Sequence, residues 1–140
     1  MNETRVAIQI DADIITARRI GRELGEQIGF TGSDLVVIAT AISEIARNIV
    51  EYARSGEIML RPTQQGSHRG ILIVAKDRGP GIADIELAMR DGYSTSKGTG
   101  LGLPGARRLM DEFDIESKVG KGTTITMKKW VAFGVRGGHF

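Results

Sequence analysis

The residues best able to do chemistry include a glycine-rich stretch that leads into an expected helix. Residues 98–103 read Gly-Thr-Gly-Leu-Gly-Leu. Glycines let the backbone approach a ligand closely, and successive free N–H groups that end at a helix N-terminus form an anion site. A loop of this composition could also be simply flexible, but the helix that follows favours phosphate binding.

Two carboxylates and an amide are the other candidates. Asp77 ends an alternating strand, and the period of two points its side chain to the same face as Ile71, Ile73 and Ala75. A carboxylate there is costly unless it accepts hydrogen bonds, and capping of the next turn explains it about as well as ligand binding. Glu44 and Asn48 share one side of an expected helix, away from its apolar stripe. Taken alone, that side is ordinarily a solvated face.

The common nucleotide-binding signatures do not fit this chain. Residues 100–105 match G-x-G-x-x-G, but they lack the preceding strand and the second βαβ unit of a dinucleotide-binding fold. The Walker pattern G-x-x-x-x-G-K-[ST] and the protein-kinase signatures H-R-D and D-F-G are absent from the sequence. A nucleotide would therefore be bound by another architecture.

The elements that must position these residues form one expected domain over residues 1–130, followed by a tail over 131–140. Apolar periodicity and turn residues predict several helices and strands, with hairpins where two strands flank a short turn. The expected helices span residues 11–28, 31–53 (or 33–53), 84–90 and 103–113, and the expected strands span 4–10, 57–63, 70–77, 115–119 and 123–129.

Composition excludes several classes of function. The net charge is only +2, basic residues are scattered or paired, and aromatic residues are few, so we expect no nucleic-acid partner. The chain has no cysteine, which excludes disulfides and thiolate chemistry, and His68 and His139 have no partner at metal-ligand spacing. No apolar run approaches the roughly 20 residues of a membrane span, and no signal pattern begins the chain. We therefore expect no membrane association and a cytoplasmic protein.

Four motifs in order resemble the ATP site of the GHKL (Bergerat) family. These are a Glu and an Asn four residues apart, a D-x-G-x-G box, a G-x-G box and a late Gly-Thr, found at 44–48, 77–81, 98–102 and 122–124. The resemblance implies an α+β fold, a two-layer α/β sandwich (Bergerat fold). Its mixed, largely antiparallel sheet would carry about three helices on one face.

The resemblance also implies ATP and Mg²⁺ as cofactors and a role for each residue. Asp77 would accept the adenine amino proton, with Thr123 supporting that contact through water. Asn48 would be an oxygen ligand of Mg²⁺. Glu44 would act as general base or orient the attacking oxygen. Lys97 would contact the γ-phosphate, and amides 98–103 would cradle the phosphates. The implied cofactor-binding residues are Asn48, Asp77, Gly79, Gly81, Ser94, Thr95, Lys97, Gly98, Thr99, Gly100, Leu101, Gly102, Leu103 and Thr123.

In its short length and its short lid between Gly81 and Gly98, the chain resembles the small bacterial anti-sigma factors and switch kinases. Within that group, the stretches 42–53, 77–82, 91–113 and 120–125 most resemble the RsbT-type switch kinases of the stressosome. That type implies phosphorylation of Ser or Thr on STAS-domain scaffold proteins, followed by activation of a PP2C-type phosphatase or another output protein. An anti-sigma factor that uses ATP to shape a partner surface is one alternative. A nucleotide-free adaptor is another, but it has no need of Glu44, Asn48 and Asp77 together.

Overall fold

A five-stranded sheet forms one layer of the computed structural model, which describes residues 3–82, 89 and 102–132. The strand order is β1-β2-β3-β5-β4, and every pair of neighbours among the described strands is antiparallel. The fold class predicted from the sequence allowed a mixed sheet, whereas the described part is antiparallel throughout. The strands are β1 (Thr4–Ile8), β2 (Gly56–Gln65), β3 (His68–Asp77), β4 (Glu112–Lys118) and β5 (Gly122–Trp130).

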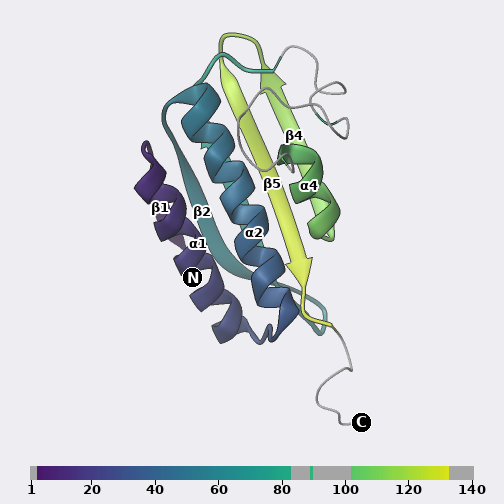
Figure 1. Ribbon diagram of the computed structural model, residues 1–140. Coiled ribbons are helices and arrows are strands. Elements are labelled where there is room, and N and C mark those ends of the chain that lie inside the picture. Colours follow the sequence, from purple (N-terminus) through teal and green to yellow (C-terminus); the bar gives the residue numbers. More distant parts are fainter. Residues whose placement is uncertain (1–2, 83–88, 90–101, 133–140) are drawn as a thin grey trace.

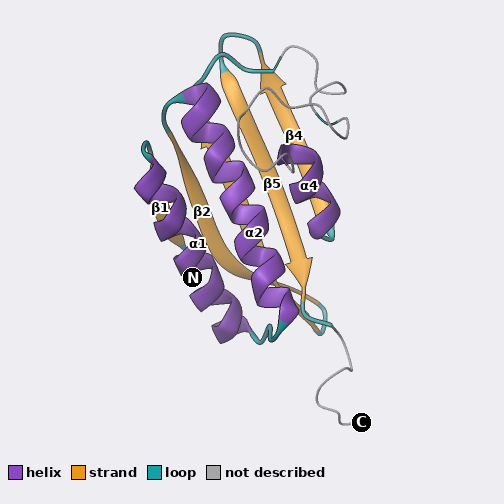
Figure 2. Ribbon diagram, viewed as in Figure 1, coloured by secondary structure: helices purple, strands orange, loops and turns teal. Residues whose placement is uncertain are grey.

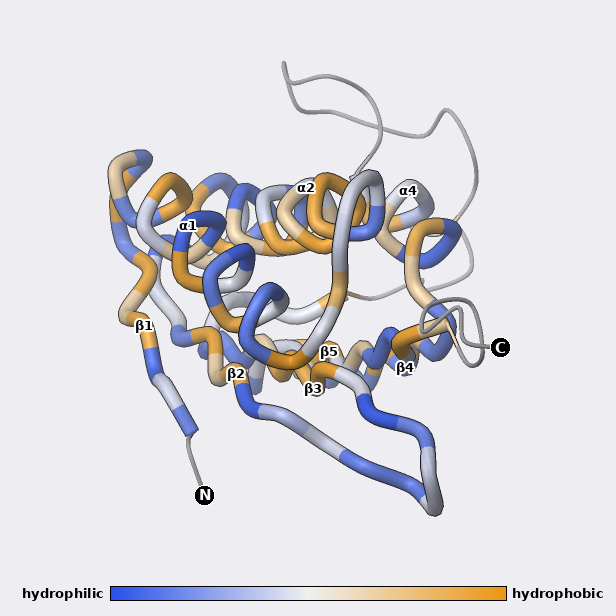
Figure 3. Tube along the Cα trace, turned by 90° about the horizontal axis from the view of Figure 1, so that it is seen from below, coloured by the Kyte–Doolittle hydropathy of each residue, from blue (hydrophilic) through white to orange (hydrophobic). Residues whose placement is uncertain are grey.

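The described helices all lie on one face of this sheet (Figures 1 and 3). They are α1 (Asp11–Ile28), α2 (Ser33–Asn48) and α4 (Gly102–Leu109). Figure 2 shows α2 lying lengthwise along the sheet, with α1 on one side of it and α4 on the other. The two-layer sandwich with about three helices on one face is thus confirmed for the described residues.

The core lies between the two layers because the helices and strands turn their apolar residues toward each other. Ile42 and Ile45 on α2 and Ile58 and Ile73 on the sheet are fully buried. A side chain at Gly21 on α1 would collide with Ile42, so the missing Cβ lets α1 pack tightly against α2. None of the described helices combines the length and apolar character that a membrane crossing needs.

The helix that carries Glu44 and Asn48 reaches Ala53 as predicted, but its end changes geometry. After Asn48 the chain continues as a π-helical turn, η1 (Ile49–Ala53), which ends at Arg54 with a φ of 72°. Single π turns inside or beside α-helices frequently occur at functional sites.

The boundaries of other elements differ from the sequence-based ones. The helix expected over 103–113 ends at Leu109, because Phe113 belongs to β4 and pairs with Met127 of β5. Alternation of exposed and half-buried residues over Glu112–Lys118 is the period of a strand. The first strand ends at Ile8 rather than at residue 10. The helix expected over 84–90 lies outside the described residues except Met89, which is buried.

Candidate functional site

Asp77 lies at the end of β3 and holds the turn that follows it. Its Oδ1 atom accepts hydrogen bonds from the backbone N–H groups of Gly79, at 2.9 Å, and Thr123, at 3.2 Å. The capping role that the sequence left open is therefore present. Both bonds go to one oxygen, and among the described residues no donor contacts Oδ2. The half-buried carboxylate thus uses one of its two acceptor oxygens in bonds to the described residues.

Glycines around Asp77 allow the neighbouring segments to pack together. A Cβ at Gly79 would lie 2.6 Å from the Cβ of Ala53 in η1. Gly81 has a φ of 80°, and a side chain there would collide with the backbone of Lys118 at the end of β4. These two positions were predicted to bind the nucleotide. In the structure the lack of a side chain at these two positions lets the turn after Asp77 pack closely against η1 and β4.

Ser117 is a site residue that the sequence interpretation missed. Its Oγ atom on β4 accepts the N–H of Ile82 at 2.7 Å, lies 2.7 Å from Oγ1 of Thr123 and donates to the carbonyl of Gly122 at 3.2 Å. Ser117 also pairs with Thr123 in the β4–β5 register. A serine inside a short strand has no motif to mark it. The correct pairing of the closing hairpin was the only signal that could have found it.

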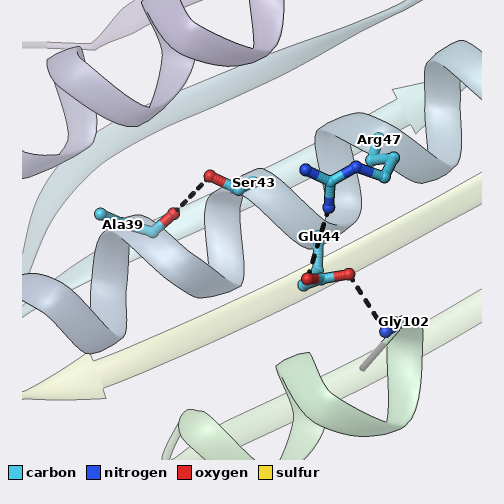
Figure 4. A network of polar contacts seen from close by, with 5 residues as sticks. All are labelled: Ala39, Ser43, Glu44, Arg47 and Gly102. Atoms are coloured by element: carbon cyan, nitrogen blue, oxygen red, sulfur yellow. Dashed lines mark hydrogen bonds and ion pairs between the residues drawn. The ribbon is translucent and has the colours of Figure 1, made fainter. Parts of the chain in front are cut away.

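Glu44 is buried, so the solvated-face interpretation of its helix side is wrong. Only 6% of the residue is exposed, because α4 packs beside α2 and covers it. The carboxylate points toward the start of α4 (Figure 4), where Oε1 accepts the N–H of Gly102 at 3.0 Å. Oε2 lies 3.4 Å from a guanidinium nitrogen of Arg47, one turn further along α2. A carboxylate at a helix N-terminus is favoured by the unsatisfied N–H groups and the dipole of that helix.

The hydrogen bond between Glu44 and Gly102 links two residues that were predicted to have independent roles. Glu44 was predicted as the catalytic carboxylate, and the N–H of Gly102 was predicted to bind phosphate. In the structure the carboxylate of Glu44 accepts a hydrogen bond from the N–H of Gly102. Leu103, the next predicted phosphate contact, has its side chain in the core at 6% exposure, so only its backbone could reach a ligand.

Asn48 is half-buried one turn after Glu44, and its side chain makes no hydrogen bond with the described residues. Its amide oxygen therefore suits the predicted role of an oxygen ligand for Mg²⁺. No group of three or more His, Asp or Glu side chains that could hold a metal ion exists among the described residues.

The α2–η1 segment connects the two halves of the candidate site. Glu44 meets the start of α4, Asn48 follows one turn later, and Ala53 at the end of η1 packs against the turn at Gly79 beside Asp77. The structure thus brings the predicted catalytic, metal and base-binding residues onto one continuous strip. The remaining predicted phosphate contacts lie outside the described residues: Ser94, Thr95, Lys97, Gly98, Thr99, Gly100 and Leu101.

Comparison with known proteins agrees with this geometry. The histidine kinase-like ATPase domain matches residues 10–129. Serine/threonine-protein kinase RsbT of Bacillus subtilis is 46% identical over 130 residues, which are 93% of this chain and 98% of RsbT. An anti-sigma F factor of a Thermoanaerobacter species is 31% identical over 82% of this chain and 83% of its own length.

Solved structures show the same fold at low identity. A mycobacterial sensor histidine kinase, MprB, superposes with a TM-score of 0.55 over 92% of this chain and 97% of its own, at 16% identity. The catalytic domain of histidine kinase ThkA gives a TM-score of 0.52, also at 16% identity, over 92% of this chain and 95% of its own. These matches confirm the Bergerat fold and carry no argument about the substrate.

The similarity to RsbT confirms the prediction of an RsbT-like serine/threonine kinase with a GHKL ATPase domain. The prediction of an ATP site is confirmed at the level of the domain. Since the domain match covers residues 10–129 and the match to RsbT covers nearly both chains, this protein belongs to the histidine kinase-like (GHKL) ATPase family.

Proposed function

We propose that this chain transfers the γ-phosphate of ATP to a serine or threonine hydroxyl of a STAS-domain protein and so acts in partner switching in a bacterial stress response. The single observation that carries the proposal is the 46% identity to the kinase RsbT across 93% of this chain. The buried Glu44 supplies a carboxylate for the acceptor hydroxyl, and the half-buried Asp77 supplies one for adenine.

Asp77 binds the adenine base in this proposal. Because its Oδ1 atom is used by Gly79 and Thr123, the Oδ2 atom is the one that accepts the adenine amino proton. Ser117 holds the hydroxyl of Thr123 at 2.7 Å and so sets where a bridging water can bind. Recognition of adenine then depends on groups from β3, β4 and β5 together.

Asn48 is the residue that would hold Mg²⁺ through its amide oxygen. When bound, the ion neutralises negative charge on the β- and γ-phosphates and on the transition state. Asn48 fits this role because it follows Glu44 by one helical turn and its side chain forms no hydrogen bond with the described residues.

Glu44 acts as the general base. Its carboxylate takes the proton of the acceptor hydroxyl while the hydroxyl oxygen forms a bond to the γ-phosphorus, and the bond from that phosphorus to the bridging oxygen breaks to release ADP. The hydrogen bond from Gly102 and the burial of the carboxylate preset its direction. Preset groups avoid the reorganisation that a solvated carboxylate would undergo.

The partners are proposed from the same resemblance. STAS-domain proteins would be the substrates and scaffold, and a PP2C-type phosphatase or another output protein would be the target after release, all in the cytoplasm. The anti-sigma alternative has a specific support, since an anti-sigma F factor is 31% identical to this chain. The larger identity and coverage of the match to RsbT favour the switch kinase.

The test is a transfer assay with γ-labelled ATP, Mg²⁺ and the STAS protein encoded nearest to this chain. Glu44→Gln is the matched control, because the glutamine oxygen can still accept the N–H of Gly102 but cannot act as a base. We expect label on a partner Ser or Thr and loss of that label with Glu44→Gln. ATP binding without transfer would replace the kinase with the anti-sigma alternative, which a sigma-factor pull-down would then test. No ATP binding would contradict both.

A further inference from the structure

Arg47 pairs with the buried carboxylate of Glu44. The two residues are neighbours on α2, three positions apart, and a guanidinium nitrogen lies 3.4 Å from Oε2. The side chain of Arg47 is 29% exposed, and that of Glu44 is 7% exposed. Figure 4 shows Arg47 contacting one oxygen of this carboxylate while Gly102 contacts the other.

Because Glu44 is buried, breaking its ion pair with Arg47 costs more free energy than breaking a pair on the surface does. Exposed helix pairs contribute little, because water screens both charges. A carboxylate out of water is costly unless charges and donors compensate it. In this structure Arg47 compensates Oε2 and the N–H of Gly102 compensates Oε1, so each oxygen has its own donor.

The two donors come from different elements of the structure. Gly102 opens α4, and its N–H was predicted to turn to a phosphate. Arg47 belongs to the same helix as Glu44, so its contact can persist when Gly102 changes partner. A planar guanidinium also constrains the direction of a carboxylate more than an ammonium does.

We propose that Arg47 is a positioning residue for phosphotransfer: it holds the carboxylate of Glu44 toward the acceptor hydroxyl and takes no part in binding ATP. The proposal rests on the proposed kinase function, and it assigns to Arg47 a role that none of the four sequence motifs includes. Misplacing a catalytic group by a fraction of its working distance reduces the rate, whereas the ground-state affinity for nucleotide is unchanged.

The experiment compares Arg47→Met and Arg47→Lys with the wild-type chain, using Arg61→Met as control. Arg61 is exposed on β2, so its replacement removes the same charge without touching Glu44. Each variant is assayed for its single-turnover transfer rate at saturating ATP, its Kd for ATP and its melting temperature. We expect Arg47→Met to lose roughly 10- to 100-fold in rate with Kd for ATP within about twofold of wild type, and Arg47→Lys to recover part of the rate.

A second comparison separates positioning from an independent role. In a Glu44→Gln background, Arg47→Met should have no further effect on the residual transfer rate, because the group that it positions is already inactive. A further loss in that background, or a parallel loss of ATP affinity, would show that Arg47 acts on the substrate itself and overturn the proposal. An unchanged rate in Arg47→Met alone would overturn it as well. A wild-type chain that transfers no phosphate would instead contradict the proposed function.

Discussion

The substitution Asp77→Asn should weaken the binding of ATP and strengthen the binding of inosine triphosphate. Asparagine carries one oxygen and one amino group where aspartate carries two oxygens. In the structure two backbone N–H groups, from Gly79 and Thr123, point at Oδ1. They fix the amide oxygen of the substituted side chain at that position. Its amino group would then occupy the Oδ2 position and face the adenine amino group, donor against donor.

The expected changes in stability and in nucleotide affinity follow from the hydrogen bonds that the substitution alters. On the folded chain, two charge-assisted bonds become neutral ones, which lowers the free energy of unfolding by about 1 kcal/mol for this half-buried group. In the complex with ATP, the charge-assisted bond from the adenine amino group to Asp77 is lost, and that amino group is left without an acceptor. That costs about 2 to 3 kcal/mol, or roughly 30- to 150-fold in Kd for ATP. Inosine triphosphate has a carbonyl where adenine has the amino group, so the same variant should bind it better than wild type does.

The assay is a titration of wild type, Asp77→Asn and Asp114→Asn with ATP and with inosine triphosphate, alongside a thermal melt of each. Asp114 is exposed on β4 and provides the same substitution away from the site. We expect weaker ATP binding and stronger inosine triphosphate binding for Asp77→Asn alone, with a melting temperature only a few degrees lower. Equal affinity of Asp77→Asn and wild type for ATP would refute the adenine role. A loss of both nucleotides together with a collapse of the fold would refute the reasoning about Oδ1 and Oδ2.

Three further outcomes follow from the site. Ser117→Ala leaves a partly buried backbone N–H without its acceptor and should lower the free energy of unfolding by about 1 to 2 kcal/mol and weaken ATP binding, which a melt and a titration will show. Gly79→Ala forces a Cβ to within 2.6 Å of the Cβ of Ala53, so we expect the free energy of unfolding, measured by chemical denaturation, to fall by about 1 to 3 kcal/mol. An unchanged denaturation midpoint would contradict the close packing. Glu44→Ala should have a free energy of unfolding about 1 kcal/mol lower than that of Glu44→Gln, since only glutamine keeps an acceptor for the N–H of Gly102. Equal melting temperatures of the two variants would show that this contact does not stabilise α4.

Element type and side-chain direction could be predicted from the sequence because both depend on local periodicity. The alternation in β3 placed Asp77 on the buried side with Ile73, and the four-residue spacing placed Asn48 one turn from Glu44. The order of the motifs led to the correct family and fold class. The end of the helix at Leu109 could not be placed, because the apolar residues around Phe113 fit the end of a helix and the start of a strand until β5 pairs with them.

The sequence by itself determined which groups are present and on which side of their own element they lie. Only the tertiary structure decided what covers them. Glu44 is buried because a helix that starts 58 positions later packs over it and donates the N–H of Gly102. The N–H of Thr123 reaches Asp77 from 46 positions away. Periodicity reports the direction of a side chain relative to its helix or strand, whereas burial and hydrogen bonding depend on contacts between elements far apart in the chain, and no local pattern encodes those.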